Sequence, residues 1–105
     1  MASIFPKRHP HSKWGGYQFK VYPSEPDKDK SKRNREAVHI HVTKIGGTGN
    51  IRVFIQDNLR INEKYESIKQ HEYGVIKEFI QKNMEFIKKK VKEEYEKTNF
   101  GHLVD

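Results

Sequence analysis

The sequence predicts an α+β domain in which a mainly antiparallel sheet of three to four strands is covered on one face by a long C-terminal helix. Two patterns indicate this fold. Between residues 17 and 62, short segments alternate apolar and polar residues with the period of two that is typical of half-buried strands. From residue 70 to about residue 97, apolar residues recur at three- and four-residue steps, which is the spacing of an amphipathic helix. A chain of 105 residues has room for a single domain.

Three segments each place three apolar side chains on one face of a strand. We expect strands at 17–22, at 37–45 and at 51–56, the second being the strongest. The glycine-rich segment 46–50 is typical of a hairpin turn, and Asp57-Asn58 predicts a second turn before a short fourth strand at 59–61. The three apolar triads are Tyr17, Phe19 and Val21; Val38, Ile40 and Val42; and Ile51, Val53 and Ile55.

The remaining segments flank the sheet. Residues 1–16 form a basic N-terminal arm, and residues 23–36 form a highly charged loop that contains almost no apolar residue. The helix is expected over 70–97, and it begins or bends at Gly74, because glycine costs about 1 kcal/mol relative to alanine in a helix. The apolar stripe of this helix is the only predicted feature that can cover the apolar face of the sheet.

The positive charge is concentrated in the first part of the chain. The formal net charge is +7. Residues 1–60 hold twelve Lys and Arg against five Asp and Glu, whereas residues 61–105 hold nine of each, so the helical part is neutral. A basic excess on one part of a surface favours nucleic acid or another polyanion as the partner, although it also serves solubility.

Composition excludes two classes of protein. The chain has no cysteine, so its fold does not depend on an oxidising compartment. The N-terminus lacks the apolar core of a signal peptide, and no apolar run approaches the ~20 residues of a membrane span. We therefore expect a cytoplasmic protein with no membrane partner.

The candidate site is the sheet face opposite the helix, which we expect to be uncovered. Basic residues interleaved with aromatic residues are typical of surfaces that stack single-stranded bases, although two aromatics also suit a protein interface. The candidate binding residues are Lys20, Tyr22, Arg35, His39, His41, Arg52 and Phe54.

The segment His39-Ile40-His41 places two imidazoles on the same strand face, roughly 6.5–7 Å apart. A zinc site would need at least a third ligand, and no spacing singles one out among His9, His11, His71 and Asp57. We therefore predict neither a metal nor a cofactor. The alternative function is a metal-independent ribonuclease-like enzyme, in which His39 and His41 would exchange protons.

The order of these segments resembles the small bacterial domain-of-unknown-function family numbered four-one-six-zero. The similarity rests on an aromatic strand that begins at Gly16-Tyr17, on the strand His39-Ile40-His41-Val42, and on the helical pattern Glu78-Phe79-Ile80-x-x-Asn83. It covers roughly residues 4–97. The family has Pro where this chain has Val38, and an Arg two residues before the first His, whereas Arg35 lies four residues before His39.

The resemblance implies a function without a defined chemistry. The family has no established activity, and its genes often lie beside other small genes in arrangements similar to toxin–antitoxin pairs. It assigns no catalytic role to either histidine. We therefore expect a small basic bacterial binding module, a toxin–antitoxin-like component that contacts a partner protein or nucleic acid, with a homodimer as a further alternative.

Overall fold

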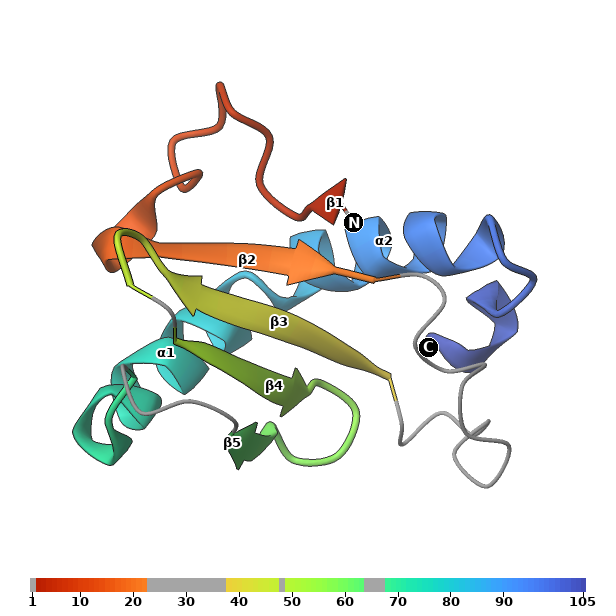
Figure 1. Cartoon of the computed structure of the whole chain (residues 1–105). Helices are drawn as coiled ribbons and strands as arrows, with labels where there is room; N and C mark the ends of the chain where they lie inside the picture. The colour runs from red at the N-terminus through yellow and green to blue at the C-terminus, as the bar shows by residue number, and fades with distance from the viewer. Residues whose placement is uncertain (1, 23–37, 48, 64–67) are drawn as a thin grey trace.

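The computed structural model describes residues 2–22, 38–47, 49–63 and 68–105. It has a five-stranded antiparallel sheet in the order β1-β2-β3-β4-β5 and two helices behind the sheet (Figure 1). The strands are β1 (Ala2–Ser3), β2 (Tyr17–Val21), β3 (His39–Lys44), β4 (Asn50–Phe54) and β5 (Arg60–Glu63), and the helices are α1 (Gln70–Lys82) and α2 (Met84–Glu96). The charged loop 23–36, including Arg35, lies outside the described residues.

The register places all three predicted apolar triads on the same face of the sheet. Phe19 pairs with Val42 and Val42 with Ile51, so apolar side chains stand side by side across the three central strands. They form one buried core with apolar residues of both helices, among them Ile76, Phe79 and Ile80 from α1 and Ile87, Val91 and Tyr95 from α2. The predicted α+β fold is confirmed, because the helices cover the apolar face as the sequence required.

The N-terminal arm adds a strand that the sequence did not predict. Ala2 pairs with Val21, and the Ile4 backbone N–H donates to the Phe19 carbonyl at 2.8 Å. Ile4 and Phe5 are buried in the core, and the ring of Phe5 stacks on that of Phe86 at a centroid distance of 5.3 Å. The start of the arm is therefore an anchored edge strand, and the sheet has five strands rather than three or four.

The predicted single helix is two helices, and the break lies at Asn83 rather than at Gly74. The backbone of Asn83 leaves the helical region at φ −116°, and its side-chain Nδ2 donates to the Phe79 carbonyl at 2.9 Å. An asparagine side chain that bonds to the backbone one turn back competes with the regular helix hydrogen bonds. Gly74 sits inside α1 without bending it, so the sequence prediction of a bend there is wrong.

The C-terminal tail packs against the sheet after a left-handed turn. Asn99 has φ 68°, and the Phe100 N–H donates to the Tyr95 carbonyl at 2.9 Å, which is the pattern of a Schellman motif. The Gln56 side chain then holds the tail at both ends: its Nε2 donates to the Leu103 carbonyl at 2.9 Å, and its Oε1 accepts the Asp105 N–H at 2.7 Å.

Gly101 is the position in this tail that we expect to tolerate a side chain least. A Cβ atom there would lie 2.1 Å from Cγ and 3.2 Å from Cβ of Glu96. We expect Gly101→Ala to lower the free energy of unfolding by about 1–2 kcal/mol, because one of the two residues must shift. Urea unfolding checks this. A matched double variant, Gly101→Ala with Glu96→Ala, should recover part of the loss, and equal losses in both proteins would contradict the steric explanation.

Candidate functional site

The sheet face that points away from the helices, called the outer face below, has a regular polar pattern. Figure 1 is viewed from this side, with the sheet in front of both helices. The pairing places one residue from each strand in a single row across the sheet: Ser3, Lys20, His41, Arg52 and Asn62. The adjacent rows contain Gln18, Thr43 and Asn50 on one side and His39, Phe54 and Arg60 on the other. The described sheet positions of this face carry no carboxylate side chain.

The two histidines lie together at the centre of the outer face, and they are buried. Their ring centroids are 5.1 Å apart, and the ring of Tyr22 meets that of His41 edge-on at 4.2 Å. The Nδ1 atom of His41 lies 3.2 Å from Oδ1 of Asn50. His39 is only 6% exposed and His41 only 4%. The expectation that this face is uncovered is therefore wrong at its centre, and neither imidazole is accessible to a phosphodiester in this structure.

Phe54 is also withdrawn from the surface. Its ring is next to that of His39, with centroids 5.3 Å apart, and the residue is 5% exposed. The Arg60 guanidinium lies over the Phe54 ring at 4.1 Å, a cation–π contact. Since base stacking needs an open ring face, the predicted stacking role does not fit Phe54 as it lies here. Tyr22 is half-buried and keeps part of its surface accessible.

Lys20 and Arg52 are the accessible charges of the central row. Each is paired across the sheet with His41, one from β2 and the other from β4, so the two cations flank the buried imidazole. Both are half-buried. Within the described part of the chain neither of them forms an ion pair, whereas Arg60 donates from Nε to Oδ2 of Asp57 at 2.8 Å.

An open hollow of about 610 Å³ adjoins Lys20 and the β3–β4 hairpin. The polar side chains of Gln18, Thr43 and Asn50 line it beside the hairpin glycines Gly46, Gly47 and Gly49. A single-stranded nucleic acid whose backbone passes Lys20 would find hydrogen-bond donors in this hollow.

The metal ligands considered from the sequence are dispersed. The rings of His9 and His11 pack on Phe5, and they also contact Phe86 and Phe79 from the helices, so they lie on the helical side of the sheet. Asp57 is paired with Arg60. Among the residues that the structure describes, no group of three or more His, Cys, Asp or Glu side chains is placed to hold a metal ion.

One charged cluster on the helical side was not predicted from the sequence. The Glu72 carboxylate accepts hydrogen bonds from the Tyr17 hydroxyl, from Lys44 Nζ at 3.1 Å and from the Lys69 backbone N–H at 2.9 Å. The Lys69 N–H first, then the Tyr17 hydroxyl and Lys44, lower the pKa of Glu72 to about 2. Burial and the neighbouring carboxylate raise the pKa of Tyr17 to about 12. The cluster joins the start of α1 to β2 and β3, so it fixes the strands that carry the outer face.

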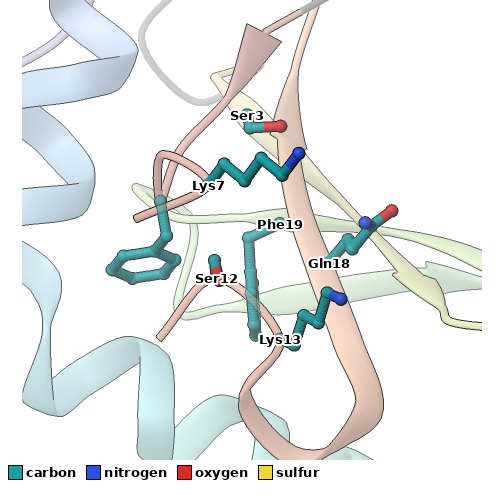
Figure 2. Close-up of a pocket in the computed structure, with 7 residues that line it drawn as sticks. Ser3, Lys7, Ser12, Lys13, Gln18 and Phe19 are labelled. Atoms are coloured by element: carbon teal, nitrogen blue, oxygen red, sulfur yellow. The ribbon is translucent and has the colours of Figure 1, made fainter. Parts of the chain in front are cut away.

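A second hollow, of about 280 Å³, lies between the arm and β2 (Figure 2). Its lining residues are Ser3, Phe5, Lys7, Ser12, Lys13, Gln18 and Phe19. The sequence showed a basic arm, but it could not show that the arm folds back on β2. The two lysines of this hollow are therefore candidate functional residues that sequence reasoning missed.

Comparison with known proteins finds no relative of this chain. No protein-family model, no curated protein and no solved structure matches this chain. Within the described residues, no helix has the length and apolar character needed to cross a membrane.

Proposed function

We propose that this chain is a small basic module that binds a single-stranded nucleic acid through its phosphate backbone, across the outer face of the sheet. The observation that carries the proposal is the central row, in which Lys20 and Arg52 flank a buried imidazole without an ion-pair partner in the described residues. Strand spacing puts their backbones about 10 Å apart on a surface free of carboxylates at its described sheet positions. Cations in such a row attract a polyanion and are not neutralised from within the sheet.

The burial of the central side chains favours contact with phosphates over contact with bases. Of the candidates that would stack on or hydrogen-bond to a base, Phe54, His39 and His41 are buried, and only Tyr22 keeps part of its surface accessible among them. The features that remain accessible to a nucleic-acid strand are Lys20, Arg52, Arg60 and the hollow beside the hairpin. Phosphate contacts position a nucleic acid but carry no sequence information, so we propose binding with low sequence preference.

The resemblance that we infer from the sequence motifs, to a family with toxin–antitoxin-like gene arrangements, is compatible with this role. A cytoplasmic bacterial module that holds RNA for a partner protein fits both the basic face and that arrangement. We make nucleic acid the proposed ligand because Lys20 and Arg52, which form no ion pair within the described residues, remain accessible on the outer face. A protein interface would be expected to expose aromatic residues at its centre.

The experiment measures the affinity of the full chain for a short single-stranded RNA by fluorescence anisotropy at about 50 mM and about 200 mM salt. We expect affinity to fall steeply with salt. We expect the double variant Lys20→Ala with Arg52→Ala to bind about ten- to thirtyfold more weakly, with a shallower salt dependence, because each lost phosphate contact removes counterion release.

The control is a double variant of equal charge on the helices, Lys82→Ala with Lys92→Ala, both exposed and remote from the outer face. A similar loss of affinity in the control would mean that net charge, not this surface, drives binding. RNA that is cleaved by the wild type but not by His41→Asn would favour the ribonuclease instead. Absence of RNA binding, together with co-purification of a neighbouring gene product, would favour a protein partner.

A further inference from the structure

The hollow between the N-terminal arm and β2 combines two features of a ligand site. Its floor is apolar, formed by Phe5 and Phe19, both of which are almost fully buried in the core. Its rim is polar, with two lysines, two serines and a glutamine. Among the residues that the structure describes, no acidic one lines the hollow. At about 280 Å³ it is close to the lower end of the roughly 300–1,000 Å³ typical of small-molecule sites.

Both ammonium groups lie on this rim, beside β2. Figure 2 shows the side chains of Lys7 and Lys13 extending from the arm toward β2, where the Gln18 amide lies. Lys7 and Lys13 are exposed, and within the described residues neither forms an ion pair. The Ser3 and Ser12 side chains add hydroxyl groups that can donate to an anion. Two free cations with neutral donors around them suit a small, doubly charged anion.

The hollow adjoins the proposed nucleic-acid surface at its end. Ser3 pairs with Lys20, so the rim of the hollow continues the central row by one strand. Gln18 lines both this hollow and the one beside the hairpin. β1 is the edge strand of the sheet, so the row of polar residues ends here. A nucleic-acid strand that follows the row over Lys20 would therefore reach Lys7 and Lys13 at the edge of the sheet.

We propose that this hollow binds the terminal phosphomonoester of a nucleic-acid strand. The proposal rests on the proposed function, since it assigns one end of the same strand. A phosphomonoester carries a charge of about −1.5 to −2 at neutral pH, whereas a backbone diester carries one negative charge, so two lysines on the rim of one hollow favour a phosphorylated end. An internal diester gains less from the same pair.

The test compares three forms of one short RNA: with a 5′-phosphate, with a 3′-phosphate and with hydroxyls at both ends. We expect one of the two phosphorylated forms to bind about five- to tenfold more tightly than the hydroxyl form, as charge-assisted hydrogen bonds to two lysines imply. The double variant Lys7→Ala with Lys13→Ala should remove this preference while the hydroxyl form keeps most of its affinity. Equal affinities of the three RNAs for the wild type would overturn the proposal.

A control and a second measurement separate this proposal from the proposed function. The variant Lys89→Ala with Lys92→Ala removes two charges from α2 and should leave the preference intact. A titration with a nucleoside monophosphate, followed by amide chemical shifts, should move Ser3, Ser12 and Gln18. If those shifts occur although no RNA binds, the hollow is a phosphate site and the proposed function fails. If neither occurs, both proposals are wrong.

Discussion

Replacement of Tyr95 by alanine is expected to lower the free energy of unfolding by about 3–5 kcal/mol, the usual cost of deleting a buried aromatic side chain. Tyr95 is fully buried at 0% exposure, in the last turns of α2 and within the main core. Its hydroxyl accepts the backbone N–H of His39 at 3.4 Å, so the ring also ties α2 to the start of β3. Urea unfolding, with the slope compared between variants, measures the loss.

Two further variants show where that loss originates. Tyr95→Phe keeps the ring and should cost about 1 kcal/mol, the usual net value of one hydrogen bond. Phe86→Ala removes an aromatic side chain that is 39% exposed, and we expect a distinctly smaller cost than for Tyr95→Ala. Similar losses for Tyr95→Ala and Phe86→Ala would contradict the burial argument. If Tyr95→Ala weakens RNA binding by more than the fraction of unfolded protein explains, the substitution also displaces β3 in the folded protein.

The fold was largely predictable because its two periodicities are strong and independent. Each apolar triad, such as Val38, Ile40 and Val42, alternates with polar residues. Because the side chains of a strand alternate between its two faces, all three apolar side chains must lie on the buried face. The helical segment carries an apolar stripe that can cover this face, so the arrangement of helices on one side of the sheet follows. β1 was not predictable, because a strand of two residues is too short to show an alternation of apolar and polar side chains. Its pairing with β2 depends on the burial of Ile4 and Phe5, which follow it in the chain.

The candidate site was predictable only as a set of positions on one face. Alternation correctly grouped Lys20, His41 and Arg52, because strand parity fixes the side on which a residue lies. It could not predict burial, which depends on neighbours such as Tyr22 and Asn50 that pack beside the imidazole. The break at Asn83 was missed for a related reason, because a side-chain hydrogen bond to the backbone leaves no mark on hydrophobic spacing.

Replacement of Glu72 by alanine is expected to destabilise the protein by about 2 kcal/mol at neutral pH, because one carboxylate serves three donors. Those donors are the Tyr17 hydroxyl, Lys44 Nζ and the Lys69 N–H at the start of α1. Without Glu72 the Tyr17 hydroxyl loses its acceptor and the first turn of α1 loses its cap. The control is Glu78→Ala, which removes an exposed pair with Lys82 and should change stability by less than about 0.5 kcal/mol.

The pH dependence of this loss follows from the direction of the two pKa shifts. The Lys69 N–H first, and then Tyr17, lower the pKa of Glu72 from 4.5 to about 2 in the folded protein, so its contribution is complete above about 4.5 and disappears as pH falls through 2. Burial first, and then Glu72, raise the pKa of Tyr17 from 10.0 to about 12, so its contribution is complete below about 10 and disappears as pH rises through 12.

Urea unfolding of wild type and Glu72→Ala at neutral pH and at about pH 3 checks this dependence. At the lower pH the unfolded carboxyl is mostly protonated while the folded one is still mostly ionised, so part of the stabilisation is already lost. The difference in free energy of unfolding between the two proteins should therefore shrink. Glu72→Gln, which keeps an acceptor oxygen without the charge, should lie between them at neutral pH. A difference that stays constant would show that Glu72 acts through packing alone.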